Sequence, residues 1–165
     1  MSLLSSALIA EATGLVVVGD GQAGLVERAL KLEGAAVRDA RVAVGESVYG
    51  ALLTDDYTTA SAESADEAER ERADLYALYL GALARLAASR LSPLVLSARL
   101  TSLGGAQVSV GEGDREARLM SVDDARKVLD DFRLAALADL AGLALAVGDV
   151  SPLDDIIAPP EIYIC

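Results

Sequence analysis

The chain has no histidine, no tryptophan and a single cysteine, Cys165. The absence of histidine excludes imidazole catalysis and imidazole metal ligands. One thiol can form neither a zinc-thiolate site nor a disulfide within the chain. Basic residues are also few: 26 acidic residues stand against 14 basic ones, which gives a net charge of −12. Because DNA is itself a polyanion, this balance is the opposite of what a nucleic-acid-binding protein needs.

Aromatic residues make up only 4% of the 165 residues, although 53% are hydrophobic. The apolar content is therefore alanine, leucine and valine, which suits closely packed helices. A membrane span needs about 20 mostly apolar residues, and the cleanest run, residues 75–84, ends at Arg85. Residues 1–19 are interrupted by Glu11 and lack the basic start of a secretory signal. We therefore expect no membrane association and predict that excess apolar surface is buried between subunits. A monomer with a large alanine-rich core is the alternative.

Apolar residues recur with helical spacing in four stretches. They predict helices over residues 1–12, 22–53, 67–91 and 121–147. Asp20 is a good N-cap for the second helix, in which Gly34, Gly45 and Gly50 favour one break. Ser92–Pro93 interrupts the third helix, which we expect to resume to residue 103. Ser121 and Asp124 predict a capping box at the last helix. Residues 54–66 are acidic and hydroxyl-rich and predict a solvated loop.

Two segments lack a helical period. Residues 106–111 and 115–119 alternate with period two around a turn at 112–114, which predicts a β-hairpin over 106–119. Residues 149–165 hold three prolines and predict an extended tail. The predicted fold is all-α: one domain, residues 1–148, of about four helices, with the hairpin inserted before the last helix and an extended C-terminal tail.

The motifs with catalytic potential are weak. Gly19, Gly21 and Gly24 form a GxGxxG pattern, which in a dinucleotide-binding fold lets the backbone approach a pyrophosphate. The long helices that follow do not supply the alternating strands of a parallel sheet. Adjacent acids on a helix point in different directions, so the pairs Asp55–Asp56, Asp123–Asp124, Asp130–Asp131 and Asp154–Asp155 do not form a carboxylate pair across a cleft. Nothing marks a Ser–Lys pair with Lys31 or Lys127, and no basic neighbour activates Cys165. We expect no catalysis, metal or cofactor.

The hairpin and the tail are the segments that core packing explains least well. An isolated two-stranded hairpin is marginally stable by itself, and the tail is apolar. We predict that both are arms that lie on a neighbouring subunit; the alternative is that they fold onto their own chain. The predicted contact residues are Val108, Val110, Ile156, Ile157, Ile162, Tyr163 and Ile164.

The order of these elements resembles the head–tail connector (adaptor, or head-completion) proteins of tailed bacteriophages. Three stretches carry the resemblance: Gly19-Asp-Gly-Gln-Ala-Gly-Leu-Val-Glu-Arg-Ala-Leu30 is similar to that family's turn and first long helix, Ala73-Asp-Leu-Tyr-Ala-Leu-Tyr-Leu80 to its central helix, and Leu103-Gly-Gly-Ala-Gln-Val-Ser-Val-Gly111 with Leu119-Met-Ser121 to its hairpin and entry into the final helix. It covers most of residues 15–147; residues 1–12 and 54–66 match no feature of the family.

The resemblance implies a structural protein of the virion neck, made in the host cytoplasm. It implies a homo-oligomeric, twelve-fold ring between the portal protein and a tail or stopper component. An acidic lumen would repel DNA and let it pass without specific binding. Two alternatives remain: a nucleotide- or dinucleotide-binding enzyme that uses Gly19, Gly21 and Gly24, and an acidic helical assembly chaperone.

Overall fold

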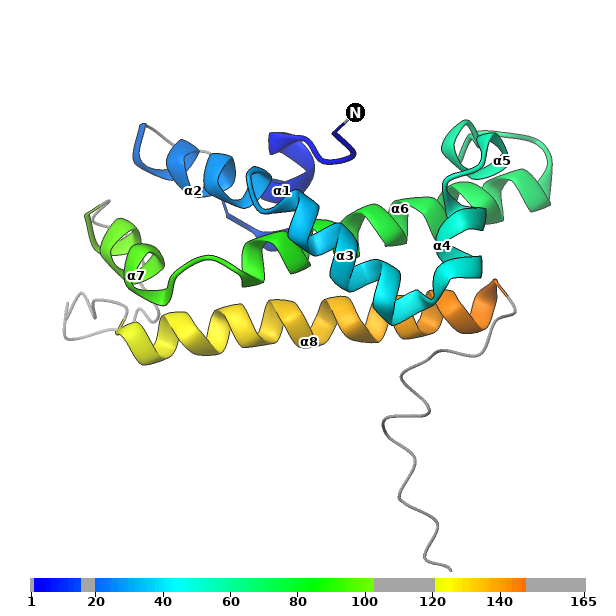
Figure 1. The fold of residues 1–165 in the computed structure, drawn as a ribbon. Coiled ribbons are helices and arrows are strands. Elements are labelled where there is room, and N and C mark those ends of the chain that lie inside the picture. The colour runs from blue at the N-terminus through cyan, green and yellow to red at the C-terminus, as the bar shows by residue number, and fades with distance from the viewer. Residues whose placement is uncertain (1, 16–19, 103–120, 148–165) are drawn as a thin grey trace, which may run out of the picture.

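The computed structural model describes residues 2–15, 20–102 and 121–147 of the chain, and these residues form an all-α fold without a strand among them (Figure 1). The helices are α1 (Ser6–Thr13), α2 (Asp20–Leu30), α3 (Glu33–Val44), α4 (Glu46–Leu52), α5 (Asp55–Thr58), α6 (Glu67–Ser89), α7 (Pro93–Ser102) and α8 (Val122–Ala146). The prediction of an all-α protein is confirmed at this level.

The two longest helices, α6 and α8, lie side by side and run in opposite directions (Figure 1). Helix α3 packs against both of them, and α1 packs against α6. Helix α5 contacts α6, while α7 contacts α2 and α8. Helices α3, α6 and α7 therefore pack on the upper side of α8, α1 lies farther up on α6, and none of the described helices covers the lower side of α8 in the view of Figure 1.

The core lies between α3, α6 and α8 and is rich in alanine. Ala36, Ala40 and Ala43 form the buried stripe of α3, at the spacing of one helix face. Small side chains let helix backbones approach closely, so larger residues are needed only where gaps remain. Tyr79 and Leu83 of α6 and Leu140 of α8 fill such gaps and are fully buried.

Several helix boundaries follow from local sequence. The predicted capping box is present: Ser121 Oγ accepts a hydrogen bond from the Asp124 amide at 3.0 Å, and Asp124 Oδ2 accepts one from the Ser121 amide at 3.4 Å. Helix α6 ends at Ser89, before the predicted break at Ser92–Pro93, and α7 follows. Asp66 caps the start of α6 through its side chain, which accepts from the Ala68 amide.

The prediction of a helix over 22–53 with one break inside it is wrong in part, because this stretch is broken twice. The structure has α2, α3 and α4 there, separated at residues 31–32 and at Gly45. Gly45 has a φ of +83°, a region that glycine adopts without steric strain, so this one glycine ends α3 and starts α4. Asp20 is the first residue of α2 rather than a cap preceding it.

Two other boundaries also differ from prediction. The first helix begins at Ser6 instead of residue 1, because Ser5 is its N-cap and accepts a hydrogen bond from the Leu8 amide. Gly14, with a φ of +66°, ends this helix close to the predicted place. The predicted loop over 54–66 contains the short helix α5. The predicted hairpin at 106–119 and the tail at 149–165 lie outside the described residues.

Candidate interaction site

An open groove with a volume of about 520 Å³ lies where α3, the end of α6 and α8 meet. We call it the α3–α8 groove. Its floor is apolar, and its rim carries two acidic and two basic residues. The residues that line it are Asp39, Val42 and Ala43 of α3, Leu86, Ser89 and Arg90 at the end of α6, and Leu129, Asp130, Arg133 and Leu137 of α8.

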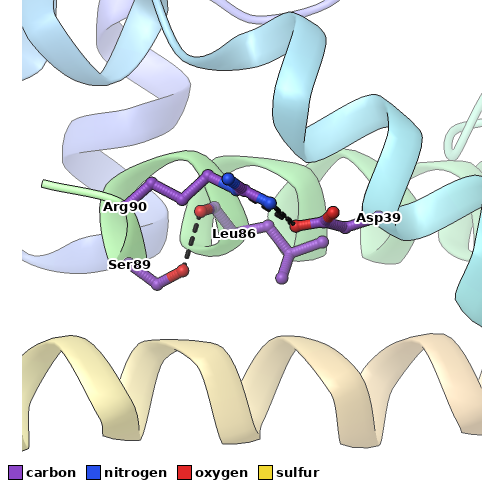
Figure 2. Close-up of polar contacts among 4 residues, drawn as sticks. All are labelled: Asp39, Leu86, Ser89 and Arg90. Carbon is purple, nitrogen blue, oxygen red and sulfur yellow. Dashed lines mark hydrogen bonds and ion pairs between the residues drawn. The ribbon is translucent and has the colours of Figure 1, made fainter.

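An ion pair across the rim links α3 to the end of α6. Arg90 follows the last residue of α6, and its guanidinium reaches back to the Asp39 carboxylate (Figure 2). Arg90 Nε donates to Asp39 Oδ2 at 3.1 Å, and Nη2 donates to the same oxygen. Both side chains remain about two-fifths exposed, so the pair orients the rim more than it stabilises the fold.

The floor of the groove carries little reactive chemistry. Ser89 Oγ donates a hydrogen bond to the Leu86 carbonyl oxygen at 2.8 Å (Figure 2), so this hydroxyl is already used. Within the described part of the chain, no three His, Cys, Asp or Glu residues lie close enough to hold a metal ion. The groove therefore offers apolar contact with a charged margin.

Arg133 is the cation on the rim that has no carboxylate partner among the described residues. The ion pairs among the described residues of the whole fold are formed by Arg41, Arg85, Arg90 and Arg126, of which only Arg90 lines the groove. Arg133 is exposed on α8 at the edge of the groove. It can interact with a negative group supplied from outside the molecule.

A second apolar surface lies on α8, outside the groove. In the first half of this helix the exposed residues are charged, such as Asp124, Lys127 and Asp131. From residue 134 onward they are apolar or small: Leu134, Ala135, Ala138, Gly142, Leu145 and Ala146. We call these six residues the α8 ridge.

The α8 ridge is exposed and carries no charge. Leu134 is 65% exposed and Leu145 is 67% exposed, both far from burial. The one charged residue of this half, Asp139, is half-buried and paired with Arg85 of α6. Arg85 also donates from Nε to the Ala12 carbonyl oxygen at 3.3 Å, so it joins α1, α6 and α8. The ridge is the solvent-facing side of a helix with apolar residues on both faces.

A second hollow, of about 480 Å³, lies between the N-terminal segment, α3 and α4. Its acidic residue, Glu33, already has partners. Glu33 Oε1 accepts from the Leu3 amide at 2.5 Å and from the Leu4 amide at 3.4 Å, and Oε2 accepts from the Ser2 hydroxyl at 2.5 Å. This carboxylate fastens residues 2–4 to the start of α3 and is not available as a free acid.

A tyrosine cluster lies in the core beside this hollow. Tyr79 has its ring centroid 6.5 Å from that of Tyr49, edge-on, and 6.2 Å from that of Tyr76. Tyr79 is fully buried, and no described residue accepts or donates a hydrogen bond at its hydroxyl. Burial raises the pKa of Tyr79, and the nearby Tyr49, Tyr76 and Glu33 raise it further. The hydroxyl is therefore protonated and unreactive near neutral pH.

Residues 54–74 form an acidic lobe at the end of the molecule that holds α5 and the start of α6 (Figure 1). They contain eight acidic and two basic residues. Most of the carboxylates are exposed. Glu69 orders part of the lobe, because Oε1 accepts from the Ser61 amide at 3.2 Å and Oε2 accepts from Ser64 Oγ at 2.7 Å.

None of the contact residues predicted from sequence belongs to the α3–α8 groove or to the α8 ridge. Val108, Val110, Ile156, Ile157, Ile162, Tyr163 and Ile164 all lie outside the described residues. Gly21 and Gly24 are part of α2, and Gly19 lies outside the described residues. Asp55–Asp56 and Asp123–Asp124 occupy the first turns of α5 and α8, where acids are favoured by the helix dipole.

The groove and the ridge were both missed by sequence reasoning. The ridge had a signal: Leu134 and Leu145 lie on the side of the predicted helix opposite its buried stripe. The groove had none, because Asp39 and Arg90 are 51 residues apart and only the packing of α3 on α6 brings them together.

The chain matches no protein-family model, no curated protein and no solved structure. Among the described residues, no helix combines the length and the apolar character that crossing a bilayer requires.

Proposed function

We propose that this protein is a non-catalytic structural subunit that assembles into a ring, in the manner of the head–tail connectors of tailed bacteriophages. In this role it joins a portal protein to a tail or stopper component in the virion neck. The proposed complete fold adds the β-hairpin at 106–119 and the extended tail at 149–165 as arms that contact neighbouring chains. The family assignment rests on the sequence resemblance.

The observation that carries the proposal is the α8 ridge. The second half of α8 is apolar on both faces, and the described residues bury one face while Leu134 and Leu145 on the other are about two-thirds exposed. Contiguous apolar surface of this kind marks a protein–protein contact. In a subunit that functions only in an assembly, a neighbouring subunit covers this apolar surface.

The charge of the molecule supports the conduit role. The acidic lobe contributes a net charge of −6, half of the total of −12, from one end of the molecule. In a ring, equivalent lobes lie at the same radius and height. A ring with these lobes toward its axis repels the DNA phosphates and lets the duplex slide without binding.

Electron microscopy of the purified protein, alone and with its virion partners, tests the proposal. We expect closed rings, and the mass of the particles from light scattering gives the number of subunits. A monodisperse monomer under both conditions contradicts the proposal. An assembly chaperone, the competing interpretation, would be absent from the finished particle, so detection of the protein in purified virions separates the two.

A further inference from the structure

We propose that the α8 ridge of one copy of this chain occupies the α3–α8 groove of the next copy. This inference rests on the proposed ring and names the two surfaces that form its subunit contact. Each copy carries both surfaces. They lie on different sides of α8, because consecutive residues such as Arg133 in the groove and Leu134 on the ridge are about 100° apart around a helix.

The apolar parts of the two surfaces match. The groove has an apolar floor that includes the buried side chains Leu86 and Leu129, and Val42 on its edge is 71% exposed. The ridge presents Leu134 and Leu145 with no charged side chain between them on the exposed face. Insertion therefore covers apolar surface on both copies, and the ridge itself brings no charged side chain into the groove, where an unpaired buried charge would be costly.

Small residues on the ridge permit close approach. Gly142 and Ala138 lie between the two leucines, and a side chain added at Gly142 would meet no atom of the described residues within 4 Å. The described residues therefore leave this part of α8 uncovered. Ala138 and Gly142 would let the helix backbone enter the groove. Leu134 and Leu145 lie on the same side of α8, one before and one after these small residues, and are about 16 Å apart along the axis at 1.5 Å per residue.

Charge complementarity gives the contact a direction. The C-terminal end of a helix carries a partial negative charge, which basic residues in the last turn normally offset. The last turn of α8 has no basic residue. Arg133 on the groove rim has no carboxylate partner among the described residues, so an inserted α8 C-terminal half brings a negative helix end to an available cation. This attraction offsets part of the repulsion between two chains of charge −12.

The contact is heterologous, because the ridge and the groove are different surfaces. A copy that inserts its ridge leaves its own groove free for a third copy, so the contact repeats until the rotation closes a ring. A contact between two ridges would instead be two-fold symmetric and would stop at a dimer.

Complementation between two broken surfaces tests the inference. Leu145→Glu places a charge on the ridge, and Val42→Glu places one on the groove edge; both positions are exposed, so the monomer fold tolerates either change. Circular dichroism at 222 nm verifies the helix content of each variant. Leu94→Glu is the matched control, since Leu94 is 66% exposed on α7 and belongs to neither surface.

Sedimentation velocity is measured on each protein alone and on an equimolar mixture of the two broken variants. We expect assemblies for the wild type and for Leu94→Glu, and loss of all species above the monomer for Leu145→Glu and for Val42→Glu. The mixture forms a heterodimer and nothing larger, because one intact ridge and one intact groove remain. An assembling Val42→Glu variant, a monomeric wild type or a monomeric mixture overturns the inference.

The same data separate this inference from the proposed function. Rings that persist in both single variants show that the ring exists but that its contact lies elsewhere. A heterodimer in the mixture, together with open filaments instead of rings for the wild type, supports the ridge–groove contact and contradicts the ring.

Discussion

The hydroxyl of Tyr79 is the group whose removal gives the sharpest stability prediction. It is fully buried beside Tyr49 and Tyr76 and has no hydrogen-bond partner among the described residues. In the unfolded chain this hydroxyl is hydrated, so folding strips it of water without a replacement. Leaving a buried polar group unpaired costs about 1–3 kcal/mol, and a small void left by the oxygen offsets part of the gain on its removal. We therefore expect Tyr79→Phe to raise the free energy of unfolding by about 1 kcal/mol.

Alkaline pH gives the same substitution a second readout. The folded pKa of Tyr79 is raised by burial above the value of about 10 that tyrosine has in an unfolded chain. As the pH rises past that value, the unfolded chain loses the proton first. Below pH about 10 this group does not change the free energy of unfolding with pH. Above pH about 10 the free energy of unfolding falls by about 1.4 kcal/mol per pH unit for this single proton, until the folded pKa is reached. Tyr79→Phe lacks this loss.

Thermal unfolding followed by circular dichroism at pH 7 and pH 11 measures both effects. For a chain of this length, about 1 kcal/mol corresponds to about 2–4 °C in Tm. We expect Tyr79→Phe to melt higher than the wild type by this amount at pH 7, and by a larger margin at pH 11. Tyr76→Phe is the control, because Tyr76 is only half-buried and should change Tm little. A Tyr79→Phe variant that melts several degrees below the wild type refutes the reasoning, because its hydroxyl must then have a partner.

Four further results are expected. Leu140→Ala should lower the free energy of unfolding by about 2–5 kcal/mol in urea titration, since Leu140 is fully buried and its loss leaves a cavity between α6 and α8; a change below 1 kcal/mol would contradict this packing. Ser121→Ala should cost about 1 kcal/mol in the same assay by removing the cap of α8, while Ser121→Asp should retain most of the stability. Gly45→Ala should cost about 1–3 kcal/mol because of its positive φ, a loss that Gly34→Ala in the first turn of α3 should not reproduce. Deletion of residues 149–165 should leave helicity at 222 nm unchanged and weaken assembly in sedimentation velocity; normal assembly with a much lower Tm would show that the tail packs on its own subunit.

The sequence predicts the parts of the fold that depend on local interactions. The spacing of Leu75, Tyr79, Leu83 and Leu86 places α6, and the Ser121–Asp124 pair marks the start of α8, because helical periodicity and capping act within a few residues. The effect of Pro93 is equally local. These features are confirmed because no distant contact competes with them.

The breaks within residues 22–53 depend on contacts that sequence proximity does not reveal. Glu33 starts α3 and also accepts hydrogen bonds from residues about 30 positions earlier. If one helix continued unbroken from α2 through Glu33, the position of Glu33 around that helix would fix the direction of its side chain. The break at residues 31–32 instead lets Glu33 point to the N-terminal segment. Gly45 could be identified as a possible break, but nothing local distinguishes it from Gly34 and Gly50, which remain inside helices.

The candidate site was not predictable for a related reason. A groove exists only when three elements are placed relative to one another, and its Asp39–Arg90 pair joins residues that the chain separates by 51 positions. The ridge had a signal in the apolar residues opposite the predicted buried stripe of α8, but only the packing of the other helices shows that this side is left exposed by the described residues. Tertiary arrangement thus gives the second half of α8, which is apolar on both sides, a core face and an exposed face.

The distribution of charge explains why the exposed apolar face lies on the second half of α8. Chains of net charge −12 repel one another, so two copies can approach most closely where at least one of the two surfaces carries no exposed carboxylate. The first half of α8 exposes Asp123, Asp124, Asp130 and Asp131, and residues 54–74 form the acidic lobe. The second half keeps its single acid, Asp139, paired with Arg85 and half-buried. The α8 ridge, which has no exposed charge on an otherwise acidic chain, is therefore a face that can approach the charged rim of a neighbour's groove without bringing two carboxylates together.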